Sequence, residues 1–200
     1  MELSDALRAR RMVRSFRADP IDPACLDRVL DAGRRAPSAG HSQGWAFVVL
    51  EGPVETTRYW DVTLPADRRP AFPWPGLLRA PVLVIPCALP GRYVARYAEA
   101  DKVRTGLGES AEAWPVPYWF VDTGMATMAM LLQAVDEGLG ACFFGIFEHE
   151  TAVRAEFGIP DDVEPVGTIA LGQPDGADRP SRSTGRGRRP RDEVVHRAGW

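Results

Sequence analysis

The sequence predicts a fold of mixed helices and strands, either α+β or α/β. Two observations support this class. A long helix is expected over 118–138, and short apolar runs typical of strands lie at 45–50, 82–87, 141–146 and 165–172. Because helical and strand segments mix along the chain, an all-helical or all-strand domain is excluded. No repeat or linker divides the 200 residues, so we expect one domain over 1–200 with a C-terminal arm from about 178.

The helix expected over 118–138 is apolar or small on almost every face, which is typical of a helix that is buried all round. Its end is predicted by Gly138-Leu139-Gly140. Asp122 and the acidic residues near its end leave no apolar run of about 18 residues, so a membrane span is not expected. Either the rest of one domain or a second subunit would cover its faces, and the sequence leaves both open.

The other helices are predicted from capping residues and from the glycines and prolines that begin or end helices. Ser4 is expected to cap a helix over 5–11, and Asp22 before Pro23 is expected to open a helix that ends near Arg35. Further short helices are expected at about 54–62, within 92–114 and over 148–157. The segment 36–40 is typical of a loop, the basic arm is expected to be extended, and 193–196 have strand character.

The composition, 45% apolar and 26% charged, is that of a globular protein. The formal charge is −3, and 179–191 hold six arginines and no acid, so the remainder carries −9 (−3 minus 6). The basic stretch 179–191 is short, contains no aromatic residue and follows an acidic domain, which argues against nucleic-acid binding. We therefore expect neither a nucleic acid nor a membrane as a partner.

The spacing of the three cysteines bears on whether the protein's compartment is oxidising or reducing. Cys25, Cys87 and Cys142 lie far apart with no CxxC spacing, and the last two stand in apolar runs, so buried free thiols are expected rather than a disulfide framework. The first residues are charged where a signal peptide needs an apolar core. We expect a cytoplasmic protein.

Few motifs carry chemistry by themselves. Arg10 and Arg14 would share a face if they were helical, and two guanidiniums there would suit a phosphate or a carboxylate, but the spacing alone favours an ordinary solvated face. Gly138-x-Gly140 follows a helix and enters a strand, so it is not a dinucleotide fingerprint. The histidines are isolated and predict no metal site. If the protein is an enzyme, a bound organic cofactor is expected to carry the chemistry, with no catalytic side chain.

Four segments, in this order, resemble the FMN-dependent nitroreductase family: RRMVRSF at 10–16, APSAGHSQGW at 36–45, the long helix ending in GLG, and RGRRP at 186–190. The resemblance covers nearly the whole chain. It implies an α+β homodimer with a central mixed or antiparallel sheet flanked by helices. The long helix would lie buried at the dimer interface, where FMN would also bind.

The resemblance also implies a cofactor site, position by position. The implied FMN contacts at the N-terminus, to the phosphate and the ring edge, are Arg10, Arg11, Met12 and Arg14. The loop that would cover the flavin of the partner subunit holds Pro37, Ser38, Ala39, His41 and Gln43. The backbone near flavin N5 would be that of Phe144, Gly145 and Ile146, and the C-terminal phosphate contacts would be Arg186 and Arg188. The family often has Ser, Asn and Pro where this chain has Met12, His41 and Gly44.

The implied activity is hydride transfer from NAD(P)H, through the flavin, to a nitro, quinone or conjugated acceptor. Two alternatives remain open: a flavin-dependent oxidase or dehydrogenase of a metabolite, and a non-catalytic flavin-binding protein. The aromatic candidates for the wall of a substrate site are Trp74, Tyr93, Tyr97, Trp114 and Trp119.

Overall fold

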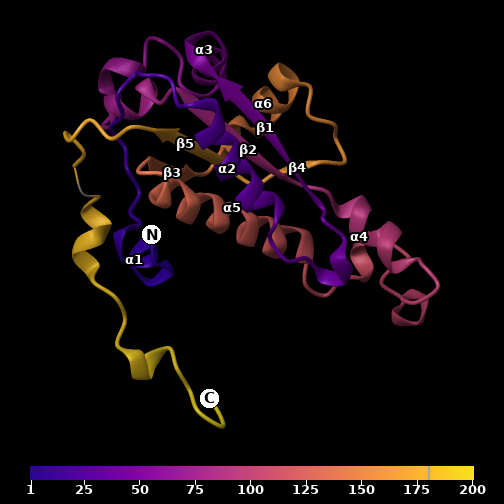
Figure 1. The fold of residues 1–200 in the computed structure, drawn as a ribbon. Coiled ribbons are helices and arrows are strands. Elements are labelled where there is room, and N and C mark those ends of the chain that lie inside the picture. Colours follow the sequence, from indigo (N-terminus) through magenta and orange to yellow (C-terminus); the bar gives the residue numbers. More distant parts are fainter. Residues whose placement is uncertain (180) are drawn as a thin grey trace.

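The structure, a computed structural model, describes residues 1–179 and 181–200 and has the α+β class (Figure 1). Its sheet has the strand order β1-β2-β5-β3, with β4 also paired to β2, and each of these pairings is antiparallel. The strands are β1 (Trp45–Glu51), β2 (Val82–Ala88), β3 (Gly140–Phe144), β4 (Glu164–Pro165) and β5 (Thr168–Gly172). The four predicted strand regions are thus confirmed, and the sheet is antiparallel.

The region predicted as one strand at 165–172 is divided into β4 and β5. Cys87 pairs with Pro165 while Val84 pairs with Ile169, so three residues on this strand stand opposite two on β2. One extra residue of this kind is a β-bulge, which interrupts the ladder and bends the strand. The amide of Val166 still donates to the Pro86 carbonyl at 2.9 Å, so the strand continues along the same edge of β2.

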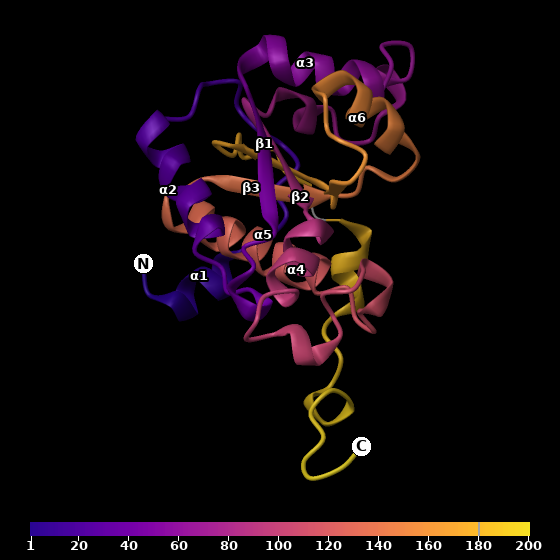
Figure 2. The same cartoon turned by 90° about the vertical axis from the view of Figure 1, so that its right-hand side faces the viewer.

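The helices are α1 (Leu3–Ala9), α2 (Pro23–Arg34), α3 (Gly52–Thr63), α4 (Pro90–Tyr97), α5 (Tyr118–Asp136) and α6 (Glu150–Phe157). Figure 1 shows α5 along one face of the sheet and α3 with α6 on the other. Figure 2, turned by 90°, brings α4 to the front, at one end of the molecule. The sheet therefore has an apolar core on each face.

One side of α5 forms the core beneath the sheet. Met130 is completely buried and packs with Val29 of α2 and with Val84 and Ile169 of the sheet. A Cβ on Gly33 would meet the Met130 side chain at 2.8 Å, so this glycine lets α2 and α5 approach closely.

The other side of α5 is exposed in the protomer. Its large apolar residues are between 36% and 43% exposed and are Tyr118, Phe120, Val121, Met125 and Met128. The expectation that one domain might bury every face of this helix is therefore wrong. A covering subunit, the other alternative that the sequence left open, stays a prediction.

The N-terminus differs from the prediction. Glu2 is the N-cap residue of α1 and no side chain caps this helix, because the helix begins before Ser4. It ends at Ala9, so Arg10 and Arg14 do not share a helical face. At α2 the prediction is confirmed, since the Asp22 side chain accepts the Ala24 amide at 2.8 Å.

The C-terminal arm leaves the sheet and extends away from it in both views (Figures 1 and 2). The predicted strand at 193–196 is wrong: a short 3-10 turn covers Arg191–Glu193 and a turn follows it. The Glu193 carbonyl accepts from the Arg189 guanidinium at 2.7 Å, and among the described residues no strand lies there to pair with this segment.

Cys87 and Cys142 are buried free thiols, as predicted, and burial raises the pKa of each to about 11. In the part of the chain that the structure describes, no helix is long and apolar enough to cross a membrane.

Candidate functional site

The segment after α1 runs in an extended conformation along the free edge of β3. Met12 forms a parallel bridge with Ala141, whose carbonyl accepts the Val13 amide at 2.9 Å. The Met12 sulfur lies 3.3 Å from the Phe143 amide, as its acceptor. The long thioether thus satisfies a backbone donor of β3, which ties this segment to the strand that ends at Phe144.

Arg14 follows on this segment and is half-buried. Its guanidinium donates to the Met12 carbonyl at 3.2 Å and lies 5.4 Å from the centre of the Trp74 ring. Its backbone amide donates to Asp178 at 2.8 Å. Among the described residues, no carboxylate forms an ion pair with the Arg14 guanidinium, so its charge is available to an anionic ligand.

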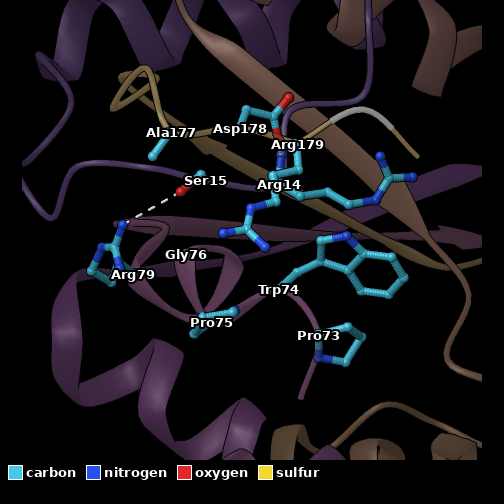
Figure 3. A pocket seen from close by; sticks show the side chains of 10 residues that line it. All are labelled: Arg14, Ser15, Pro73, Trp74, Pro75, Gly76, Arg79, Ala177, Asp178 and Arg179. Atoms are coloured by element: carbon cyan, nitrogen blue, oxygen red, sulfur yellow. Dashed lines mark hydrogen bonds between the residues drawn. The ribbon is translucent and has the colours of Figure 1, made fainter. Parts of the chain in front are cut away.

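A cavity of about 290 Å³, named here the arginine pocket, opens beside Arg14 (Figure 3). It is lined by Arg14, Ser15, Pro73, Trp74, Pro75, Gly76, Arg79, Ala177, Asp178 and Arg179. Figure 3 shows the Arg14 guanidinium reaching into the space between Arg79 and Trp74. Arg79 is neutralised, because it pairs with Asp175. Arg14 is therefore the less compensated of these two cations.

A second cavity of about 300 Å³, named here the aromatic pocket, lies on the other side of Trp74. One wall is formed by Phe144, Gly145 and Ile146, and the others by residues such as Trp60 and Phe72. Trp60 and Phe144 stack with ring centres 5.8 Å apart. Since Trp74 lines both pockets, the fold brings the predicted Phe144–Ile146 segment beside the predicted Arg14.

The residue that follows this segment has an unusual backbone. Phe147 has φ 49° and is 81% exposed, and its ring covers Gly145, where a Cβ would meet it at 2.5 Å. A bulky residue in this region of φ is rare and strained. The pocket mouth therefore carries an exposed aromatic ring on a strained turn.

The predicted loop lies elsewhere, beside α4 and the first turns of α5. Pro37, His41 and Gln43 are exposed. The Nε2 atom of His41 lies 2.6 Å from the side-chain Nε2 of Gln43. Within the described residues, no hydrogen bond joins this loop to either pocket. One protomer thus leaves Ser38 and Ala39 outside the arginine and aromatic pockets.

The remaining predicted arginines are not gathered with Arg14. Arg10 is half-buried at the end of α1, whereas Arg11 is exposed and 3.7 Å from Asp178. Arg186 and Arg188 are exposed on the arm. Neither of them is among the described residues that line the arginine pocket.

Sequence reasoning missed the carboxylates that organise this region. Asp175 accepts hydrogen bonds from the Ser15 hydroxyl at 2.7 Å and from the Arg79 guanidinium. These contacts lower the pKa of Asp175, and the hydrogen bond from Ser15 has the largest effect. Asp178 holds the Arg14 amide. No local sequence pattern predicts the role of Asp175 or of Asp178, because each contact joins residues about 160 positions apart.

Of the aromatic candidates, only Trp74 lines the two pockets. Tyr93, Trp114 and Trp119 are at most 8% exposed and pack against one another in a separate cluster. They belong to the core between α4 and α5, and none of them lines the arginine or the aromatic pocket. Tyr97 borders a different hollow, with Trp114 on another of its sides.

Comparison with known proteins gives consistent matches. The family model described as "Nitroreductase family" matches residues 7–173. A protein of Methanothermobacter thermautotrophicus with the provisional name NADH dehydrogenase/NAD(P)H nitroreductase is 27% identical over 178 residues, covering 87% of this chain and 78% of that protein.

Solved structures share the fold. A protein of Parabacteroides distasonis with the same provisional name superimposes with a TM-score of 0.69 at 21% identity, covering 99% and 98% of the two chains. An FMN-dependent nitroreductase of Clostridium difficile gives a TM-score of 0.67 at 19% identity, covering 98% of each chain.

Proposed function

The chain belongs to the nitroreductase family, and from this premise we propose that it is an FMN-dependent oxidoreductase. It would take hydride from NAD(P)H and reduce a nitro, quinone or conjugated acceptor. The observation that supports this most is the position of Trp74 between the arginine pocket and the aromatic pocket. A cationic hollow next to an apolar aromatic one suits a ligand with an anionic end and a flat ring.

The chemistry of the donors fits FMN. A phosphate or an electron-rich ring edge needs a cation that is not already paired, and Arg14 has no carboxylate partner among the described residues. Phe144–Ile146 would supply backbone groups at the ring, and Met12 fixes their strand through the amide of Phe143. Bound FMN would supply two-electron redox chemistry, which these side chains lack.

The protein's own residues would bind, orient and exclude water. The aromatic pocket presents mostly apolar surface, so an acceptor placed there would be shielded from solvent. Trp74 packs against the Arg14 guanidinium and limits the positions that this cation can take. No side chain is assigned as a proton donor.

A homodimer is part of this proposal. The exposed face of α5, with Val121, Met125 and Met128, is continuous with exposed apolar residues of α1, Leu3 and Leu7. A contiguous group of large exposed apolar side chains is typical of a subunit interface. In such a dimer, the loop with Pro37, Ser38, Ala39, His41 and Gln43 would reach the cofactor of the partner, and Arg186 and Arg188 of the arm would reach its phosphate.

The test is reconstitution of the purified protein with FMN, followed by anaerobic stopped-flow reduction with NADH and with NADPH. We expect flavin absorbance that stays with the protein on gel filtration, bleaching by at least one nicotinamide, and reoxidation by a nitroaromatic or a quinone. A protein that retains no FMN would refute the proposal. Retention without turnover on a broad panel of acceptors would favour a flavin-binding protein.

A further inference from the structure

The loop at 38–44 contains three residues with left-handed backbone conformations. Gly40 has φ 60°, and His41 and Gln43 have φ 58° and 48°. Residues with side chains rarely adopt this left-handed region, so such a turn persists only where the surrounding structure holds it. The groups that hold it come from α4 and α5.

The first of these groups is a buried acid on α5. Asp122 is 1% exposed, and its Oδ2 accepts both the Ala39 amide and the Tyr93 hydroxyl, each at 2.8 Å. A carboxyl group is costly to bury unless it is hydrogen-bonded, and these two donors satisfy Oδ2. Oδ1 is buried and has no hydrogen-bond partner among the described residues. Burial, followed by the contact with Asp122, raises the pKa of Tyr93, which keeps the phenol protonated as a donor.

The second group is on α4. The Arg96 guanidinium donates to the Gly40 carbonyl at 2.9 Å, and two further bonds of 2.7 and 2.8 Å to Asp101 fix its direction. The Tyr93 ring also packs where a Cβ on Gly44 would stand, only 2.1 Å from its Cε2 atom. The left-handed turn is therefore held at Ala39, at Gly40 and at Gly44.

We propose that Asp122, Tyr93 and Arg96 form a clamp that sets the conformation of the loop at 38–43 for cofactor binding. This inference rests on the proposed function, in which that loop contacts FMN. The three residues are positioning residues: they hold backbone atoms of the loop and do not themselves touch the cofactor. A loop set in advance loses less conformational freedom when the ligand binds, so the clamp increases affinity.

The test compares Asp122→Ala, Asp122→Asn and Tyr93→Phe with the unmodified full-length protein. Two quantities are measured: the Kd for FMN by flavin-fluorescence titration, and the amide hydrogen exchange of 38–43 in the FMN-free protein. For Asp122→Ala we expect a Kd about tenfold higher, the factor that the loss of a buried hydrogen bond typically gives, and faster exchange. Asn keeps an acceptor oxygen, so Asp122→Asn is expected to restore most of the affinity. Tyr93→Phe is expected to have a smaller effect.

Thr56→Val is the matched control, because Thr56 is 4% exposed and its hydroxyl donates to the Gly52 carbonyl on α3, away from the loop. It is expected to lower Tm without changing the Kd. If Asp122→Ala is insoluble, Arg96→Gln tests the same clamp from α4. Faster exchange with an unchanged Kd overturns the clamp, and so does a higher Kd with unchanged exchange. If the unmodified protein binds no FMN, the proposed function fails and the inference fails with it.

Discussion

The family resemblance assigns two segments to the cofactor, the loop at 37–43 and the C-terminal arm from about 178, and these are held in opposite ways. In the loop, His41 and Gln43 have left-handed backbones, which cost on the order of 1–3 kcal/mol each. Hydrogen bonds from the loop to the buried Asp122 of α5 and from the half-buried Arg96 of α4 offset that cost. In the arm, Arg186 and Arg188 are exposed, and Arg189 bonds to Glu193, four residues away.

The two segments would therefore contact a ligand in different ways, one with a preformed conformation and the other by becoming ordered on binding. The loop takes its shape from the protomer, before any ligand or second subunit is present. Arg186 and Arg188 of the arm are exposed to solvent, so their contacts with a ligand would be gained only on binding, at the cost of ordering the chain. Variants in the two segments should therefore differ in which quantity they change.

The largest effect is expected from replacing Arg10 and Arg14 together by Ala, which tests whether the arm alone can hold the phosphate. Hydrogen bonds to charged groups contribute roughly 1.5–3 kcal/mol each, and of the two only Arg14 is among the described residues that line the arginine pocket, so the Kd for FMN should rise by about one to two orders of magnitude. The measurement is a fluorescence titration. Arg17→Ala, which removes an exposed pair with Asp19, is the control and should leave the Kd unchanged. An unchanged Kd in the double variant would assign the phosphate to other groups.

Gly44→Ala tests how firmly the loop is packed. The new Cβ would stand 2.1 Å from the buried Tyr93 ring, and overpacking of this kind typically costs about 1–3 kcal/mol. We expect a Tm lower by roughly 2–4 °C for each kcal/mol, measured by calorimetry. Gly91→Ala, on the exposed first turn of α4 with open space around it, should not lower Tm. Equal Tm values for the two variants would mean that the loop moves freely.

Replacing Arg186 and Arg188 together by Ala tests the arm. We expect the Kd for FMN to rise by roughly tenfold, because the ordering of the arm offsets part of the gain from each contact. The Tm of the FMN-free protein should stay the same, since both side chains are exposed. Arg189→Ala, which removes the pair with Glu193, is the control and should alter neither quantity. A lower Tm in the double variant would show that the arm stabilises the protomer.

The smallest effect is expected at Asp175, near the point where the chain leaves the sheet for the arm. The hydroxyl of Ser15, the amide of Ala177 and the guanidinium of Arg79 lower its pKa below the ordinary 3.8. A lowered pKa in the folded state gives stability that is present above the ordinary value and is lost as the pH falls below it. Asp175→Asn should therefore have a small Tm deficit that is constant from about pH 5 to 7, begins to shrink near pH 3.8 and is lost as the pH falls through the lowered pKa of the folded state. A deficit that persists in acid would contradict the ion pair with Arg79.

Much of the fold was predictable because its signals are local. The apolar run of β2 predicted a strand, and Asp22 before Pro23 predicted the start of α2. The errors arose where tertiary contacts decide. The bulge between β4 and β5 depends on pairing with β2, and the end of α1 depends on the docking of Met12 against β3.

The candidate site was predictable only in part. Arg14 and Phe144–Ile146 come from the resemblance, and the structure brings them together around Trp74, which periodicity did not distinguish from the buried aromatic residues. The roles of Asp122 and Asp178 had no sequence signal, because each holds a backbone amide that is distant in the chain.

The sequence by itself determined the four strand regions, the start of α2 and the apolar character of α5, because caps, breakers and periodicity act within a few residues. The tertiary structure alone decided which face of α5 is buried and which is exposed. It also decided that the Arg14 guanidinium has no carboxylate partner among the described residues and that the turn at Gly40 is left-handed. Both properties depend on packing and hydrogen bonds between residues far apart in the chain.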